Sequence, residues 1–269
     1  GDDSVTVSTN DIETVSGGAG IDDVTLTDAS GNLVDLDGVE VVVGSAGDDS
    51  VTVSTNDIQS ISGGAGIDDV TLTDASGNTV DLAGVEVITG SEGSDILTVT
   101  DDTSVTLDGG DGADTLIGNV GDDTLLGGSG SDTLIGGGGA DVVDGGQDDD
   151  LLELDGSSAG VTAEGGDGTD TVVLVGETNE ASLSGVEVVT GSAGDDSVTV
   201  STNDIQSISG GSGIDDVRLT DASGNTVALA GVEVITGSDG SDILTVTDDT
   251  SVMLDGGDGA DTLIGNVGD

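Results

Sequence analysis

The amino-acid sequence predicts an all-β repeat solenoid with no second domain. A nine-residue motif recurs five times without interruption between Gly109 and Glu153. One third of the chain is apolar and falls in short alternating runs, while Phe, Tyr and Trp are absent. Such a composition cannot build a globular core, but it can bury a thin continuous core between stacked coils.

The five central motifs share one pattern of residue types. They read GGDGADTLI, GNVGDDTLL, GGSGSDTLI, GGGGADVVD and GGQDDDLLE, with Gly first, Asp sixth and Leu or Val eighth. Gly also fills positions two and four except at Asn119 and Asp148. Glycine permits left-handed and tight-turn backbone, so the carbonyl oxygens of such a turn can face one point beside the aspartate. Oxygen-only ligands of this kind suit Ca²⁺ better than Mg²⁺.

The apolar runs outside these turns predict strands. VTVST, ILTVTD, VTLTD and VEVIT alternate β-branched residues with Thr or Glu in period two. We expect their Val, Ile and Leu side chains to point inward and their Thr side chains to point outward. The eighth position of each nonapeptide is expected to be the inward residue of a short strand that follows the turn.

The nonapeptides resemble the RTX (hemolysin-type) calcium-binding repeat, GGxGxDxUx. The resemblance implies a right-handed parallel β-roll or β-helix with about two nonapeptides per coil and Ca²⁺ between turns stacked on the same side. Same-side partners would then lie two motifs apart. It further implies an extracellular or cell-surface protein, exported by type I secretion from a Gram-negative bacterium.

Longer repeats contain the nonapeptides. Units of 46 residues cover 1–46, 47–92 and 194–239, and 146–193 is a diverged, slightly longer copy of the same unit. RTX arrays cover 90–153 and 237–269. Segments 44–122 and 191–269 differ at only five positions. Because the chain begins and ends inside motifs, we expect one continuous solenoid over 1–269 that is a window of a longer chain.

Motif spacing and the resemblance together predict where metal ions bind. Turns that begin about two motifs apart should share an edge and an ion, and a step of about three motifs should move the next pair to the opposite edge. The expected pairs are Asp3 with Asp22, Asp49 with Asp68, Asp196 with Asp215, and Asp242 with Asp261. The turns at 54–57, 74–78, 82–86 and 101–104, and their copies, are expected to be poor in ions.

The central array is expected to form a continuous ladder of sites. Its predicted ligands on one edge are Asp95, Asp114, Asp132, Asp150 and Asp170, with Asp123 and Asp141 on the other. The turn glycines expected at these sites are Gly109, Gly112, Gly118, Gly121, Gly127, Gly130, Gly136 and Gly139. The alternative is that these aspartates are solvated turn formers, but turn chemistry alone does not require a nine-residue spacing.

Charge excludes several partners. The net charge is −55, and Arg218 is the only basic residue. Bound cations must neutralise this charge before the chain can collapse. Phosphate binding needs Lys and Arg, so nucleic acid is excluded as a partner.

No apolar run approaches the ~20 residues of a membrane span, so no membrane insertion is expected. The absence of Cys is compatible with secretion, and weak calcium modules are extracellular.

The sequence predicts no catalytic residue, no organic cofactor site and no enzyme. His, Cys, Lys and Tyr are absent, so no usual nucleophile–base pair can form.

Three alternative functions remain. The TVT and TLT segments suggest an ice-binding solenoid, although they recur only once per long unit. The RTX resemblance suggests a folding and secretion module of a secreted toxin or enzyme. Near-identical tandem units favour a structural fibre, surface layer or adhesin stalk, with end-to-end or lateral self-association.

Overall fold

The computed structural model describes residues 1–9, 13–156 and 160–266. Its described part consists of strands and turns. The chain divides into two compact units, Gly1–Ile135 and Gly136–Asp269, and strand β15 (Thr133–Gly138) crosses the boundary between them. No helix in the described ranges is long and apolar enough to cross a membrane.

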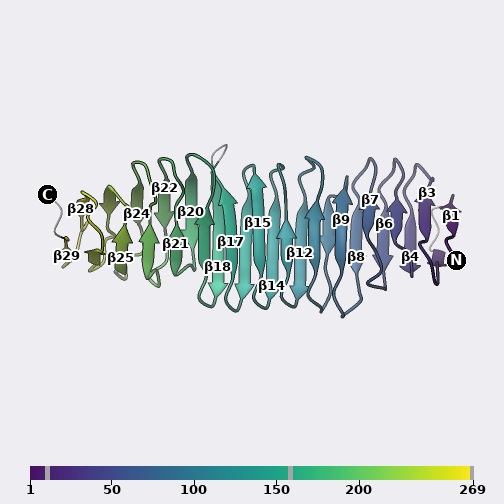
Figure 1. The fold of residues 1–269 in the computed structure, drawn as a ribbon, viewed down its shortest axis with the longest axis horizontal. Coiled ribbons are helices and arrows are strands. Elements are labelled where there is room, and N and C mark those ends of the chain that lie inside the picture. The colour runs from purple at the N-terminus through teal and green to yellow at the C-terminus, as the bar shows by residue number, and fades with distance from the viewer. Residues whose placement is uncertain (10–12, 157–159, 267–269) are drawn as a thin grey trace. The chain divides into compact units, whose positions relative to one another are not determined.

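Unit 1 is built from two parallel sheets whose strands alternate along the chain. In one sheet the strands pair in the order β1 (Ser4–Val7), β3 (Asp23–Leu26), β5 (Val41–Val43), β7 (Ser60–Ser62), β9 (Thr79–Ala83), β11 (Ile96–Val99), β13 (Thr115–Ile117) and β15. In the other they pair in the order β2 (Glu13–Ser16), β4 (Leu33–Asp37), β6 (Ser50–Val53), β8 (Asp69–Leu72), β10 (Val87–Thr89), β12 (Thr106–Asp111) and β14 (Thr124–Ser129). Figure 1 shows these strands stacked side by side.

Unit 2 repeats the same alternation. Its odd-numbered sheet contains β17 (Leu151–Asp155), β19 (Thr171–Leu174), β21 (Val188–Thr190), β23 (Ser207–Ser209), β25 (Thr226–Ala230), β27 (Ile243–Val246) and β29 (Thr262–Ile264). Its even-numbered sheet contains β16 (Val142–Gln147), β18 (Val161–Asp167), β20 (Glu180–Ser184), β22 (Ser197–Val200), β24 (Asp216–Leu219), β26 (Val234–Thr236) and β28 (Met253–Asp255). These pairings in both units are parallel, as the sequence predicts.

The core of each unit lies between the two sheets and consists of files of aliphatic side chains, in which each successive coil contributes one residue. In unit 1, Val51 pairs in register with Val70, which pairs with Ile88. All three are at most 4% exposed, and full burial of such a side chain stabilises the fold by about 1.5–3 kcal/mol. The predicted period-two strands and inward aliphatic residues are therefore confirmed.

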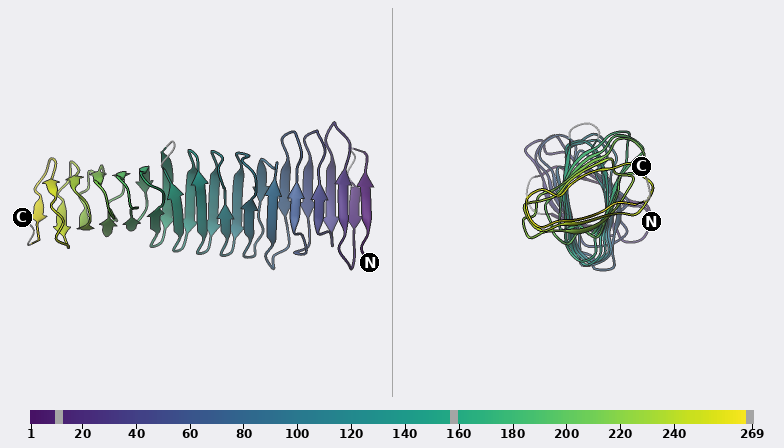
Figure 2. Two further views of the ribbon diagram at one scale, coloured as in Figure 1. Left: turned by 45° about the horizontal axis from the view of Figure 1, so that its top comes forward. Right: turned by 90° about the vertical axis from the view of Figure 1, so that its left-hand side faces the viewer.

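The turns lie at two edges of each unit, and the left view of Figure 2 shows them above and below the strands. We call the turns that lead into odd-numbered strands the first edge, and those that lead into even-numbered strands the second edge. Two consecutive turns of one edge are separated by one full coil. This arrangement brings carboxylates that are about two motifs apart in the sequence next to each other in space.

Candidate metal sites

Aspartates on one edge form files that run from coil to coil. The backbone N–H of each aspartate donates to Oδ1 of the aspartate in the next coil. In unit 1 these bonds are Asp3 to Asp22 at 2.8 Å, Asp49 to Asp68 at 2.8 Å, Asp95 to Asp114 at 2.7 Å and Asp114 to Asp132 at 2.7 Å. In unit 2 they are Asp150 to Asp170 at 2.9 Å, Asp196 to Asp215 at 2.9 Å and Asp242 to Asp261 at 3.0 Å. The structure thus brings together all four predicted pairs.

The pairs alternate between edges as the spacing predicts. In unit 1, Asp22 precedes β3 on the first edge, whereas Asp68 precedes β8 on the second. Asp123 and Asp141 precede β14 and β16, on the second edges of their units. Oδ1 of Asp123 accepts from the N–H of Val105 at 2.9 Å. Metal binding by any of these residues stays a prediction.

Eight Gly-rich turns form what we call cradle turns, in which the glycines at positions two and four both have positive φ. In the turn 109–114 these are Gly110, at 99°, and Gly112, at 128°. The other members are the turns 17–22, 63–68, 127–132, 136–141, 165–170, 210–215 and 256–261. Positive φ is nearly cost-free only for Gly, which explains the composition of these two positions.

The glycine at position one is required for a different reason. Gly109 does not have positive φ. A Cβ placed on it would lie 2.7 Å from the carbonyl oxygen of Gly127 and closer still to Oδ2 of Asp114. At Gly17 the same construction lies 2.6 Å from Oδ2 of Asp22. Oxygen atoms therefore converge on the Cα of the first glycine in a cradle turn.

A second class of turn carries serine at position two and is called Ser-locked here. Its members are the turns 44–49, 90–95, 191–196 and 237–242. In the turn 44–49, the N–H of Ser45 donates to Oδ2 of Asp49 at 2.7 Å, and the side-chain amide of Asn32 donates to Oδ1 at 2.6 Å. The same two bonds recur in the other three members. Both oxygens of these aspartates therefore have protein donors.

Five of the cradle-turn aspartates keep one carboxylate oxygen without a protein donor. The buried Oδ2 atoms without a hydrogen-bond partner include those of Asp22, Asp68, Asp114, Asp170 and Asp215. These five side chains are at most 2% exposed. A buried, unpartnered carboxylate oxygen is strongly unfavourable, so each of these positions calls for a cation.

The pKa values of these carboxyls agree with that requirement. Burial raises the pKa of Asp114 to about 6, although the N–H of Asp95 opposes the shift. Burial likewise raises the pKa values of Asp68, Asp170 and Asp215. Burial penalises the ionised form of each carboxyl, and a cation bound beside it would offset that penalty.

The donor set fits Ca²⁺. In the described part of the chain, no group of three or more Asp and Glu side chains gathers closely enough to hold an ion alone. Backbone carbonyls would then supply part of the coordination, such as that of Gly38 beside Gly17 and that of Gly127 beside Gly109. Carboxylates combined with several carbonyl oxygens are typical of calcium sites.

Two motifs depart from the glycine pattern. Asn119 and Asp148, the two non-glycine residues at positions two and four, keep positive φ of 82° and 73°. The turn 145–150 is therefore preserved at Asp148, whose exposed side chain adds nothing to the buried site. In the turn 118–123, Gly121 lacks positive φ, so this turn fits neither class.

Sequence reasoning missed the Asn and Glu residues at the ends of the files. The DASGN turn, which is expected to be poor in ions, places the side-chain amides of Asn32 and Asn78 against the carboxylates of Asp49 and Asp95. The Gly-Val-Glu turns place a glutamate after the last aspartate of a file, as where Oε2 of Glu40 accepts from the N–H of Asp22. Asn32 lies 17 residues before Asp49, and Glu40 lies 18 residues after Asp22. A search at these spacings from each motif aspartate would have identified both residue types.

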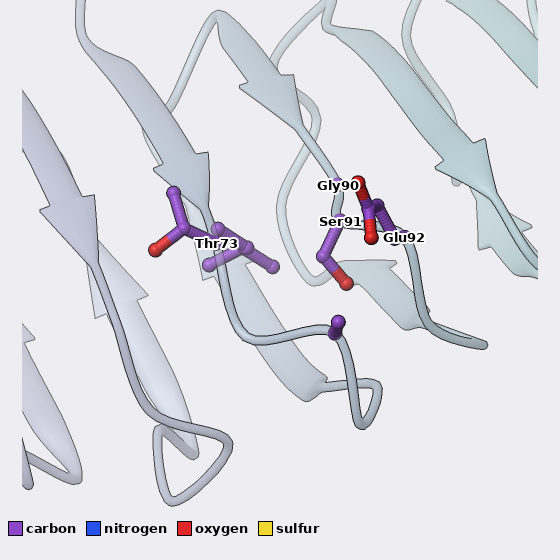
Figure 3. Close-up of a pocket in the computed structure, with 6 residues that line it drawn as sticks. Thr73, Gly90, Ser91 and Glu92 are labelled. Carbon is purple, nitrogen blue, oxygen red and sulfur yellow. The ribbon is translucent and has the colours of Figure 1, made fainter.

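An open groove lies at the first edge of unit 1, between the turns that follow β8 and β10. It measures about 420 Å³ and is lined by Leu72, Thr73, Ala75, Gly90, Ser91 and Glu92. Figure 3 shows Glu92 and Ser91 on one side and Thr73 on the other. With one acidic and no basic or aromatic side chain, this groove is unsuited to an anionic ligand or a sugar.

Comparison with known families identifies the repeats. The family model of the RTX calcium-binding nonapeptide repeat matches in four copies, at residues 36–57, 106–134, 117–152 and 253–269. No curated protein matches the chain. The matched segments contain the cradle turns 109–114, 127–132, 136–141 and 256–261 and the Ser-locked turn 44–49. The chain therefore carries RTX calcium-binding nonapeptide repeats in an all-β parallel solenoid fold, and the ion these repeats bind is Ca²⁺.

Proposed function

We propose that this chain is a segment of an extracellular structural repeat protein, a fibre, surface layer or adhesin stalk, that Ca²⁺ folds and stiffens. The observation that carries the proposal is the long duplication. Segments 44–122 and 191–269 are nearly identical, and their turns make the same contacts. Asp49 bonds to Asp68 at 2.8 Å in one copy, and Asp196 bonds to Asp215 at 2.9 Å in the other.

Such repetition suits a mechanical role, because each copy carries the same sites and adds the same length. A solenoid is stabilised by neighbour-to-neighbour contacts, so it can be extended without a new core. A module that only assists the folding and secretion of a toxin or enzyme does not need near-identical copies. That module is the alternative function, supported by the RTX repeats themselves.

The charge supports calcium-dependent folding outside the cell. A net charge of −55 opposes compaction until cations neutralise it. Weak calcium modules work where calcium is millimolar, outside cells. We therefore place the protein at the cell surface or beyond it, exported by type I secretion from a Gram-negative bacterium, as is typical of RTX repeat proteins.

The outer faces support neither ice binding nor catalysis. On the second sheet of unit 1, Thr52, Thr71 and Thr89 stand in register, but Asp35 and Asp108 bound the row. Such a row is too short for a regular threonine lattice. The chain also lacks the His, Cys, Lys and Tyr residues on which catalysis usually depends. We therefore assign this segment no enzymatic activity.

Self-association belongs to the same proposal. Rows of exposed carboxylates on neighbouring chains repel one another until divalent cations bridge or screen them. We expect lateral or end-to-end association to appear only in calcium. Sedimentation velocity in chelator and in calcium measures it directly, and a monomer in both conditions contradicts this part of the proposal.

The test of the whole proposal is small-angle X-ray scattering in chelator and then in millimolar Ca²⁺. An unfolded chain of this length has a radius of gyration of roughly 57 Å, and calcium is expected to reduce it by about half. A compact chain that persists in chelator would contradict calcium-dependent folding. If the export of a fused reporter requires this segment and calcium causes no association, the secretion-module alternative is favoured instead.

A further inference from the structure

The Gly-Val-Glu turns lie directly after cradle turns on the same edge. Their glutamates are Glu40 and Glu86 in unit 1 and Glu187 and Glu233 in unit 2. Each Oε2 accepts the backbone N–H of the preceding cradle aspartate; the bonds are Asp22 to Glu40 at 2.7 Å, Asp68 to Glu86 at 2.8 Å, Asp170 to Glu187 at 2.7 Å and Asp215 to Glu233 at 2.9 Å. The four turns therefore present one arrangement four times.

In each file the glutamate takes the place of the next aspartate. Within the array, the N–H of Asp114 bonds to Oδ1 of Asp132 at 2.7 Å. Asp22 makes the equivalent bond to Oε2 of Glu40, whose own N–H returns a bond to the Asp22 carbonyl at 3.1 Å. One coil further along the same edge, Gln59 takes the corresponding position and donates its N–H to the Glu40 carbonyl at 2.8 Å, so Glu40 is the last carboxylate of its file.

The glycine of the same turn supplies a carbonyl oxygen at the same place. Gly38 has φ of 60°. Its carbonyl oxygen lies closer to the position of a Cβ on Gly17 than the Gly127 carbonyl oxygen lies to that of a Cβ on Gly109 in the array. Oδ2 of Asp22 points to the same spot, since a Cβ on Gly17 would lie 2.6 Å from it. The carbonyls of Gly84, Gly185 and Gly231 approach their cradle turns in the same way.

Charge makes a cation necessary at this place. Asp22 is 2% exposed and Glu40 is 6% exposed, and Oδ2 of Asp22 has no hydrogen-bond partner. Two neighbouring buried carboxylates without a counterion are strongly destabilising. The sole basic side chain of the protein, Arg218, is exposed. The Ser-locked turns do not have this need, because both oxygens of Asp49 accept bonds from protein donors.

We propose that Glu40, Glu86, Glu187 and Glu233 are calcium ligands. Each completes a site with the aspartate and carbonyl oxygens of the preceding cradle turn. The Gly-Val-Glu turn therefore supplies half of the ligands of a metal site in every long unit. This site lies between the second aspartate of each pair and the glutamate in the next coil. This inference rests on calcium binding by the repeats, which the proposed function also requires.

The test uses glutamine in place of the four glutamates. Glutamine keeps the length of the side chain and an oxygen that accepts the aspartate N–H, but it loses the charge that a calcium ligand provides. Isothermal titration calorimetry with Ca²⁺ on the full chain counts the bound ions. The variant E40Q/E86Q/E187Q/E233Q is expected to bind four fewer ions, and each single variant one fewer. Glu177→Gln, at an exposed glutamate, is the matched control and should bind the unchanged number.

The outcomes separate this inference from the proposed function. If the unaltered chain binds no calcium, the calcium-dependent function fails. If it binds calcium and the quadruple variant binds the same number with unchanged affinity, only the glutamate assignment is overturned. Should the quadruple variant not fold in calcium, as measured by circular dichroism, the single variants decide, because each removes one charge and leaves the other three sites intact. A single variant that retains every ion overturns the assignment.

Discussion

The backbone N–H of Asp95 lies 2.7 Å from Oδ1 of Asp114, and this bond determines how the carboxylate of Asp114 is used. Oδ1 is committed to the neighbouring coil, while the buried Oδ2 keeps no protein donor. One oxygen therefore holds adjacent coils in register and the other remains for a cation. Calcium binding and coil stacking are thus coupled through a single side chain.

Replacing Asp114 with asparagine separates these two tasks. The amide keeps an acceptor for Asp95 but places an uncharged N–H₂ group where the unpartnered oxygen stood. We expect the calcium concentration for half-folding to rise roughly tenfold, which corresponds to about 1.4 kcal/mol. Circular dichroism during a calcium titration measures it. Asp111→Asn, at an exposed aspartate of the same motif, serves as the control, and equal midpoints for the two variants would refute the role of Asp114.

Acidification is expected to stabilise the calcium-free chain. The pKa of Asp114 is about 6 in the folded state, against a usual value of 3.8. Between these values the folded chain binds more protons than the unfolded chain, so the free energy of unfolding rises as pH falls through this window. Asp68, Asp170 and Asp215 shift in the same direction. Circular dichroism in chelator should therefore show a larger folded fraction at pH 5 than at pH 7.

Calcium reverses this pH dependence. Protons compete with the ion for the same carboxylates, so calcium affinity should fall as pH decreases through about 6, the pKa of Asp114. Calorimetric titrations at pH 7.5 and 5.5 measure the change. An affinity that does not depend on pH would mean that these buried carboxyls are not the ligands.

The first glycine of a cradle turn should not tolerate even a methyl group. In Gly109→Ala the new Cβ would lie 2.7 Å from the Gly127 carbonyl oxygen, although the backbone φ is ordinary. Overpacking of this kind costs about 1–3 kcal/mol, and here it also fills the space in which oxygens converge. Gly265→Ala is the matched control, because nothing lies within 4 Å of its Cβ. Urea unfolding in calcium should separate the two variants clearly.

Much of the fold could be predicted because a half-coil has a nearly constant length. About two half-coils separate Asp49 from Asp68, which places both on one edge. About three half-coils separate Asp22 from Asp49, which places these two on opposite edges. Period-two alternation locates the strands, since inward aliphatic residues must form continuous files. These relationships depend only on local geometry repeated along the chain.

The division into cradle and Ser-locked turns could not be predicted from the nonapeptide pattern alone. It depends on whether position two, such as Ser45 or Gly64, can adopt positive φ and on which residue the next coil brings alongside. Asn32 reaches Asp49 across 17 residues, and Glu40 reaches Asp22 across 18. Such contacts follow from coil-to-coil register, which becomes definite only once both sheets are assembled.

Ser45→Gly should convert a Ser-locked turn into a cradle turn. The substitution changes the motif from GSAGDD to GGAGDD and allows positive φ at position two, which would withdraw the N–H donor that Oδ2 of Asp49 now uses at 2.7 Å. The chain should then bind one additional calcium ion. Calorimetry counts the ion, and Ser54→Gly, at an exposed serine without an aspartate contact, is the control. If the number of ions stays the same while affinity falls, serine supports the neighbouring site and does not close its own.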